Sequence, residues 1–250
     1  MLKQLLDNEI AKLQSALLKE PVYNLRISAL LTAYGANQSF FNVWHENFKS
    51  VVASLDGRFF VGESDDSNLD EIKEFLLFAP GALSISGKKE TVEKLGISYN
   101  KRTDYFVMIN KSCCGAKTVE TENNPKLTDI YKLISESGSD DITIGSFNEW
   151  YADMSHRIRH DCAKAYCLKE NGQAVSALLV SALSQKSGLI SGVVTAKECM
   201  GRGYALALIS KACRELENEG CFAVTECSQK LYEFYQIAGF KQAGEYTIIE

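Results

Sequence analysis

The sequence predicts a mixed α/β protein, and its length of 250 residues allows one to two domains. Segments with helical periodicity alternate along the chain with short apolar runs of strand length. Adjacent extended runs are joined twice by dipeptides that favour a hairpin turn, Asp56-Gly57 and Asn171-Gly172. Two of the predicted helices are followed by a glycine that favours positive φ, at Gly35 and at Gly96.

The first half of the chain opens with two predicted helices. A stripe with a period of about 3.6 residues defines the first of them, and its members are Leu2, Leu5, Leu6, Ile10, Leu13 and Leu17. Pro21 interrupts the chain, and a second helix follows at Tyr23–Tyr34. The further predicted elements are strands at Phe40–His45, Val51–Leu55 and Phe59–Val61, a helix at Leu69–Phe78, a strand at Ala82–Ser86, a helix at Glu90–Leu95 and a strand at Tyr105–Ile109. We find no chemical motif in this half.

A segment with little apolar periodicity, Asn110–Lys126, separates the two halves, although Lys117–Thr121 within it is a predicted strand. We place the domains at residues 1–115 and 116–250. The elements predicted for the second domain are a helix at Thr128–Glu136 with Thr128 as its N-cap, a helix at Phe147–His160, strands at Ala163–Leu168, Val175–Ser184 and Leu189–Thr195, a helix at Gly203–Glu219, a strand at Phe222–Cys227, a helix at Gln229–Ile237 and an extended segment from Phe240. No sequence repeat relates the halves, but both share a strand-helix-strand order.

Composition and charge exclude several classes of protein. The chain is 46% hydrophobic and 24% charged, which is typical of globular proteins. Its net charge of −5 argues against a nucleic-acid partner, because a phosphate-binding protein normally carries a basic excess. No run approaches the roughly 20 apolar residues of a membrane span, and the N-terminal segment lacks the apolar core of a signal peptide. We therefore expect a cytoplasmic protein with no nucleic-acid or membrane partner.

The eight cysteines form neither a disulfide framework nor a zinc motif. No C-x-x-C pair occurs, and the first 112 residues hold no cysteine. The positions are Cys113, Cys114, Cys162, Cys167, Cys199, Cys213, Cys221 and Cys227. This scatter predicts reduced and mostly buried thiols.

The segment that carries chemistry runs from Gly192 to Ala205 and reads GVVTAKECMGRGYA. A predicted strand ends there, the chain turns through Gly201 and Gly203, and a helix begins. Because the first N–H groups of a helix have no intrahelical acceptor and its dipole is positive there, this arrangement predicts an anion site. Glycine allows a pyrophosphate to approach the backbone. The segment is not a Walker loop, since no Gly-Lys-Ser/Thr follows, and it lacks the three-glycine dinucleotide spacing.

A second motif, Tyr235-Gln236-Ile237-Ala238-Gly239-Phe240, lies downstream of this loop. The order of elements and the two motifs together resemble the GNAT superfamily of acyl-CoA-dependent N-acyltransferases. The family pattern Gln/Arg-x-x-Gly-x-Gly/Ala and the frequent loop form Arg-Gly-Lys-Gly-Tyr-Ala are similar to Met200–Ala205, and the family's Tyr-x-x-x-Gly-Phe ending is similar to Tyr235–Phe240. The Val-x-Thr and the acidic residue that precede the loop in the family correspond to Val193, Thr195 and Glu198. The resemblance covers about residues 116–250.

The resemblance implies a fold and a reaction. The fold is a mixed, mostly antiparallel sheet flanked by helices, and the strand-helix order of the first half favours an N-terminal α/β domain that is a degenerate copy of it. The reaction is transfer of an acetyl group from acetyl-CoA, as co-substrate, to a primary amine. The amine attacks directly in a ternary complex, and the acceptor is a small molecule or a peptide.

The resemblance also implies the site residues. Cofactor-binding roles fall on Val193, Val194 and Thr195 for the pantetheine arm, on Gly201, Arg202, Gly203, Tyr204 and Ala205 for the pyrophosphate, and on Ser228, where the family often has Asn. Val194 would polarise the thioester carbonyl through its N–H, and Tyr235 would protonate the leaving thiolate. No metal is expected. Each role has a plainer alternative: the loop as a simple helix start, Tyr235 as a packed aromatic and Ser228 as an N-cap.

Two positions depart from the family pattern. Met200 stands where the family has Gln or Arg, which removes a polar side chain from the phosphate site, and Lys197 stands where a Pro is usual. The general base that deprotonates the ammonium is not identified by any motif, and its candidates are Glu198, Asp153, His156 and Glu226.

Other features have competing interpretations. His156 and His160 have a spacing that can hold a metal, but Arg157 stands where a metalloprotease has Glu, so a structural helix or one that recognises an anionic acceptor through Arg157 and Arg159 is favoured. Cys199 has no adjacent His to activate it as a nucleophile. The leucine stripe of the first helix is assigned to the core or to the interface between the halves, with a homodimer contact as the alternative.

The leading hypothesis is therefore an acetyl-CoA-dependent N-acetyltransferase. The alternative is a non-catalytic acyl-CoA-binding or regulatory module, which Met200 and the missing base motivate.

Overall fold

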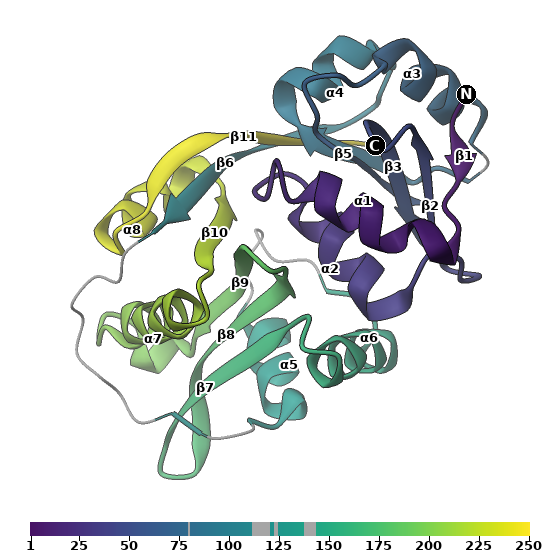
Figure 1. Cartoon of the computed structure of the whole chain (residues 1–250). Coiled ribbons are helices and arrows are strands. Elements are labelled where there is room, and N and C mark those ends of the chain that lie inside the picture. Colours follow the sequence, from purple (N-terminus) through teal and green to yellow (C-terminus); the bar gives the residue numbers. More distant parts are fainter. Residues whose placement is uncertain (80, 112–120, 123–124, 138–143) are drawn as a thin grey trace. The chain divides into compact units, whose positions relative to one another are not determined.

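The computed structural model describes residues 1–79, 81–111, 121–122, 125–137 and 144–250. These residues form two compact units (Figure 1). The first unit comprises Met1–Val107 and Gly244–Glu250, and the second unit comprises Met108–Ala243. No helix in the described ranges is both long and apolar enough to cross a membrane.

The first unit is an antiparallel meander followed by a parallel strand, with helices on both faces. Its elements are β1 (Lys3–Gln4), α1 (Ile10–Leu17), α2 (Leu25–Tyr34), β2 (Phe41–Glu46), β3 (Ser50–Leu55), β4 (Arg58–Val61), α3 (Leu69–Phe78), β5 (Ser84–Lys88), α4 (Lys89–Leu95) and the start of β6 (Arg102–Asn110). Strands β1 to β4 pair antiparallel in sequence order, and β4 pairs parallel with β5. The Asp56-Gly57 hairpin turn has positive φ at both residues, as a type I′ turn requires.

The second unit has the same plan. Its elements are α5 (Leu127–Glu136), α6 (Phe147–Arg159), β7 (Lys164–Glu170), β8 (Gln173–Leu183), β9 (Ser187–Thr195), α7 (Tyr204–Asn218), β10 (Phe222–Cys227), α8 (Tyr232–Ile237) and the start of β11 (Lys241–Ile249). Strands β7, β8 and β9 pair antiparallel, and β9 pairs parallel with β10. Apart from the short β1 of the first unit, both units therefore run helix, helix, three antiparallel strands, helix, parallel strand, helix, strand. The sequence shows no repeat, but the fold does.

The last strand of each half completes the other unit. Residues Tyr246–Ile249 of β11 pair antiparallel with β5 in the first unit. In the second unit, β6 follows β10 in the sheet order, and Sγ of Cys227 lies 3.4 Å from Sδ of Met108. The units thus differ from the sequence division at residue 115, because the C-terminal residues return to the first unit.

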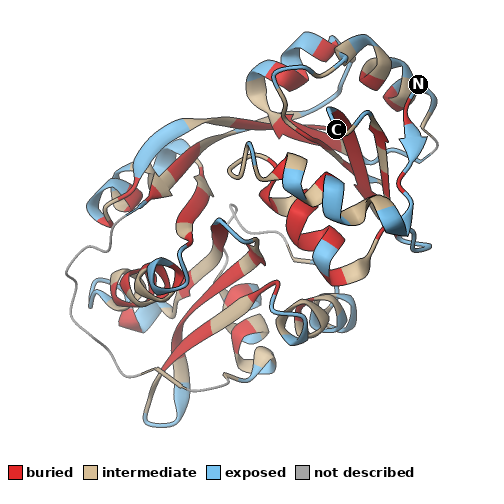
Figure 2. Ribbon diagram, in the orientation of Figure 1, coloured by how far each residue is buried: buried red, intermediate tan, exposed pale blue. Residues whose placement is uncertain are grey.

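Alternating burial along the strands creates a core on each face of the sheet. In the first unit, Phe41 and Val43 pack with α1 and α2, whereas Val52 and Phe59 pack with α3 and α4. In the second unit, α5 and α6 cover β7, β8 and β9 around a cluster that includes Val194. The buried residues, drawn in red in Figure 2, lie on the strands and on the inner sides of these helices. The mixed, mostly antiparallel sheet with flanking helices is thus confirmed.

Local differences from the predicted elements have identifiable causes. Leu2 and Leu5 do not share a helix stripe: Lys3–Gln4 between them pairs with β2, and the two leucines enter opposite cores. Helix α5 begins at Leu127 with Lys126 as N-cap, so Thr128 lies inside the helix rather than capping it. The predicted strand at Lys117–Thr121 lies almost wholly outside the described residues. Six cysteines of the described ranges are free and buried, while Cys113 and Cys114 lie outside those ranges.

Candidate active site

Strands β9 and β10 separate where the predicted site begins. Their parallel ladder joins Ser187–Ile190 to Phe222–Thr225 and then ends, although β9 continues to Thr195 and β10 to Cys227. Gly192 has a φ of 57°, and the register of β9 against β8 shifts beside it. A bulge of this kind bends a strand, so the final residues of β9 leave β10 and their outer edge has no ladder partner on that strand.

A pocket of about 500 Å³ lies in the second unit at this separation. Its lining comes from β9, from the glycine loop, from the first turn of α7 and from α8 with the turn before it. The members are Val193, Thr195, Cys199, Met200, Gly201, Gly203, Tyr204, Ala205, Leu206, Leu231, Phe234 and Tyr235. The sequence-predicted loop, strand end and tyrosine therefore meet at one cavity.

The glycine loop leaves the beginning of α7 open to the pocket. Gly201 and Gly203 have φ values of 76° and 82°, which side-chain-bearing residues rarely adopt, and a Cβ added at either would meet no atom within 4 Å. Gly203 is the N-cap of the 15-residue helix α7, and no side chain caps it. The first N–H groups of α7 therefore keep the anion-binding potential of a helix N-terminus.

Glu170, at the end of β7, holds the loop from one side. Nη1 of Arg202 donates to Oε2 of Glu170 at 3.2 Å, and Nη2 donates to the Glu198 carbonyl at 3.1 Å. The Tyr204 hydroxyl also donates to Glu170, and this contact raises the pKa of the Tyr204 phenol. Sequence reasoning missed Glu170, because only tertiary packing brings the β7–β8 hairpin to the loop.

The three consecutive β9 residues of the predicted pantetheine site point in different directions. Val194 is opposite Ala177 of β8, its carbonyl accepts from the Ser176 hydroxyl at 2.8 Å, and the Ala196 N–H donates to Val175 on the same side. Since N–H groups alternate in direction along a strand, the Val194 N–H points toward β8. By the same alternation the N–H of Thr195 points to the open edge, whereas Val193 lies within the register shift between Ser191 and Val194, where regular alternation does not apply. The sequence expectation had assigned the carbonyl donor to Val194.

Two hydroxyls near this separation are buried without a hydrogen-bond partner among the described residues, Oγ1 of Thr225 and Oγ of Ser228. Ser228 begins the turn before α8, but its side chain does not cap that turn. Buried hydroxyls without partners are costly unless a ligand or water bonds them. The N-cap interpretation of Ser228 is therefore not supported, and Thr225 is an addition that sequence reasoning missed.

Tyr235 lies in α8 with 5% of its surface exposed. Its ring packs against Phe234 and Phe240, with centroids 5.2 Å and 5.5 Å away. The residue is thus both a packed aromatic and part of the pocket wall.

The base candidates occupy different settings. Asp153 receives two hydrogen bonds from Arg157, at 2.5 Å and 2.7 Å, and Arg157 also donates to the Ser181 carbonyl of β8. This pair fixes α6 to the sheet, so neither member is a free recognition group. The rings of His156 and His160 are tilted by 36° to each other, with centroids 4.3 Å apart. Glu198 is exposed, and Glu226 follows the last ladder residue of β10.

Diverging parallel strands beside an uncapped helix N-terminus are typical of a site for a phosphate-bearing ligand. Comparison identifies the particular family. Residues 127–240 match the model of the acetyltransferase (GNAT) family. The resemblance seen in the sequence is confirmed, and transfer of an acyl group from acyl-CoA is the reaction of this family.

Solved structures extend the fold likeness over both units. A GNAT acetyltransferase from Colwellia psychrerythraea is 11% identical, with 100% of this chain and 99% of that chain covered at a TM-score of 0.59. A GCN5-related N-acetyltransferase from Kribbella flavida is 11% identical, with 96% and 94% covered at 0.60. A tandem GNAT protein from the clavulanic acid biosynthesis pathway is 11% identical, with 99% and 97% covered at 0.62. Among curated proteins, none matches the sequence. At this identity the likeness concerns the fold alone.

Proposed function

We propose that this protein transfers an acetyl group from acetyl-CoA to a primary amine of a small molecule or peptide, by direct attack in a ternary complex. The observation that carries the proposal is the single pocket at which the uncapped N-terminus of α7, the open edge of β9 and Tyr235 meet. Free, buried thiols among the described residues agree with a reducing, cytoplasmic location.

The pocket residues fit acetyl-CoA. The backbone of Gly201–Ala205 would bind the pyrophosphate, because no side chain obstructs the loop and the helix dipole favours an anion there. The open edge of Val193–Thr195 would pair with the amide groups of the pantetheine arm, as an added strand does. The unpartnered hydroxyl of Ser228 would gain a hydrogen bond from the bound arm.

The reaction requires stabilisation of the oxyanion that forms when the amine attacks the thioester carbonyl. One well-placed N–H donor contributes about 3–4 kcal/mol to such a step. We assign this donor to the N–H of Val193, which lines the pocket, in place of that of Val194, which points toward β8.

The thiolate that leaves must then take up a proton, and Tyr235 is the group proposed to supply it. The Tyr235 phenol carries one O–H donor, and a departing thiolate can accept its proton. Of the four base candidates, Glu226 is the one that neighbours the separation of β9 and β10, and Asp153 is already bonded to Arg157.

The alternative is an acyl-CoA-binding module without catalysis, for which the exposed Met200 in the phosphate loop is the specific observation. The two functions differ in thiol release. Incubation with acetyl-CoA and a panel of primary amines, with free thiol measured over time, should give amine-dependent release above the hydrolysis rate without amine. Saturable acetyl-CoA binding with no release for any amine would favour the module.

A further inference from the structure

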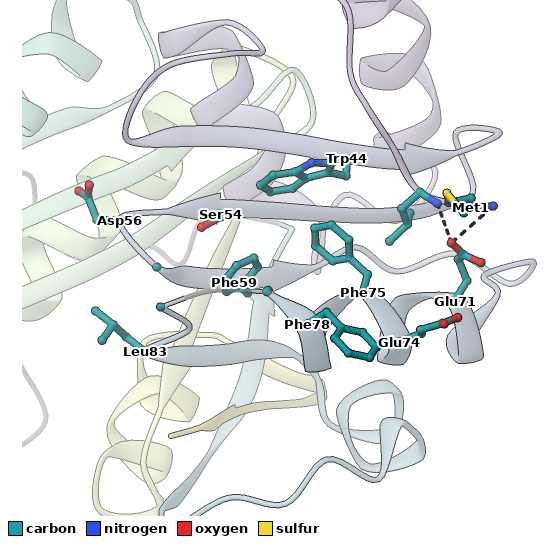
Figure 3. Close-up of a pocket in the computed structure, with 14 residues that line it drawn as sticks. Met1, Trp44, Ser54, Asp56, Phe59, Glu71, Glu74, Phe75, Phe78 and Leu83 are labelled. Atoms are coloured by element: carbon teal, nitrogen blue, oxygen red, sulfur yellow. Dashed lines mark hydrogen bonds and ion pairs between the residues drawn. The ribbon is translucent and has the colours of Figure 1, made fainter.

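A second cavity, of about 680 Å³, lies in the first unit. It shares no lining residue with the pocket proposed to bind acyl-CoA. It opens between α3 and the strands β2, β3 and β4, with Leu83 at one side (Figure 3), and Gly81 also lines it. This volume is within the range of sites for small molecules.

The repeat explains why the cavity is open. In the second unit, the helix that packs on this face of the sheet is α7, with 15 residues, and its last turns reach β7: the Tyr166 hydroxyl donates to Glu215 at 2.8 Å, and Lys164 pairs with Glu219. The corresponding helix α3 has 10 residues and ends at Phe78. Among the described residues, α3 therefore does not extend over the aromatic side of β2 and β4 as α7 extends over β7.

The walls of the cavity are aromatic. The ring of Trp44 lies 5.0 Å from that of Phe75 and 6.4 Å from that of Phe59, centroid to centroid. At the mouth, Phe78 is 82% exposed and Leu83 is 64% exposed. Exposed large apolar side chains around an aromatic cavity are typical of a ligand site.

Carboxylates outnumber cations in the cavity, where the one cation among the lining residues is the Met1 amine, paired with Glu46 and Glu71. Asp56, Glu71 and Glu74 contribute carboxylates, and no Lys or Arg lines the cavity. Glu71 accepts from the Leu2 N–H at 2.7 Å and lies 3.4 Å from the Met1 amine, as the dashed lines in Figure 3 indicate for Met1. Asp56 and Glu74 have no ion-pair partner within the described part of the chain.

A buried polar group also faces the cavity. Ser54 lines it with 9% of its surface exposed, and its hydroxyl has no hydrogen-bond partner among the residues that the structure describes. This hydroxyl can accept a hydrogen bond from a polar group of a ligand.

We propose that this cavity binds a hydrophobic amine in its protonated form. The apolar part of the ligand lies against Trp44, Phe75 and Phe78, and the ammonium group lies near the carboxylate of Glu74, while Asp56 at the opposite end of the cavity adds a second unpaired negative charge (Figure 3). Carboxylates and aromatic faces both attract a cation, and both disfavour an anion of the same shape. The site does not depend on the acetyl transfer proposed for the second unit.

Trp44 is a direct reporter of binding, because the chain has two tryptophans and the other, Trp150, lies in α6 of the second unit. In a Trp150→Phe background, the fluorescence of Trp44 is titrated with 4-phenylbutylamine, 4-phenylbutanol and 4-phenylbutyrate. We expect a saturable change with the amine and affinity at least about tenfold weaker for the carboxylate. Equal affinity for all three, or no saturable change with the amine, would overturn the proposal.

Matched variants locate the site. Asp56→Asn with Glu74→Gln should weaken amine binding about tenfold and leave the alcohol unchanged, and Phe78→Ser should weaken both ligands. Asp70→Asn and Leu77→Ser are the controls, since Asp70 and Leu77 are exposed on the same helix and do not line the cavity. If the affinity for the amine is unchanged in both the Asp56/Glu74 and the Phe78 variants, the ligand binds elsewhere and the proposal is refuted.

Discussion

The guanidinium of Arg202 in the phosphate loop donates a hydrogen bond of 3.2 Å to the carboxylate of Glu170 at the end of β7. The same carboxylate accepts from the Tyr204 hydroxyl at the first residue of α7. The Glu170 carboxylate thus lies beside the loop proposed to bind a pyrophosphate. It accepts a hydrogen bond from Arg202, the one cationic side chain of the segment Gly201–Ala205.

Glu170→Gln should tighten binding of acetyl-CoA by about threefold to tenfold, because the substitution removes a negative charge near the phosphates and leaves Arg202 available to them. Isothermal titration at low salt measures the effect. Glu198→Gln is the control, since Glu198 contacts Arg202 through its main-chain carbonyl. Weaker binding in Glu170→Gln would mean that positioning of the loop outweighs repulsion.

Gly203→Ala should weaken acetyl-CoA binding at least about tenfold, because the added Cβ enters the space proposed for the phosphate and φ of 82° is strained for alanine by about 1–2 kcal/mol. Gly220→Ala provides the control: φ there is 76°, a Cβ also meets nothing within 4 Å, and the residue follows the far end of α7. The Tm of thermal unfolding should fall by a similar amount in the two variants. Equal acetyl-CoA affinity in both would refute the loop's role.

Tyr235→Phe should lower kcat by about 100-fold or more and change acetyl-CoA affinity little, because it removes the proposed proton donor and keeps the ring. Tyr232→Phe is the control, since that hydroxyl bonds Gln242 at 3.1 Å at the surface. Free-thiol release against pH measures the effect. A Tyr235→Phe enzyme at full rate would exclude the acid role.

The chain should bind one acetyl-CoA, although it contains two units of the same plan. In the first unit, the segment that precedes α3 carries Glu63, Asp65 and Asp66, and the Asn68 side chain accepts from the Glu71 N–H at 3.3 Å and so caps the helix. Carboxylates and a capping side chain both oppose phosphate binding there. A titration with a stoichiometry near two would contradict this expectation.

Glu9 should stabilise the first unit at neutral pH and cease to do so in acid. Hydrogen bonds from Lys3, from the Leu6 N–H and from His45 lower the pKa of Glu9 to about 2, below its ordinary value of 4.5. Because the folded-state pKa is the lower one, the stabilisation is present above pH 4.5 and is lost as the pH falls toward 2. Glu9→Gln should therefore lower Tm at pH 7, and its difference from the parent should shrink between pH 5 and pH 2. A constant difference would refute this.

Local features of the sequence were enough to locate most elements. Leu69–Phe78 and Phe222–Cys227 have the predicted bounds, since helical periodicity and a short apolar run depend on neighbours in the chain. The helix predicted from the leucine stripe was wrong at its start. Leu2 and Leu5 belong to opposite cores, and Lys3–Gln4 pairs with a strand that follows some 40 residues later.

The sequence by itself determined the fold class and the position of the glycine loop, because positive φ at glycine and an uncapped helix start are properties of a few consecutive residues. Only the tertiary structure decided which N–H groups of β9 face the open edge, which carboxylate holds Arg202, and that β11 completes the first unit. It also decided that a shorter α3 leaves an aromatic cavity open. Each of these depends on the pairing of segments that are far apart in the chain, and strand register and packing carry no local signature.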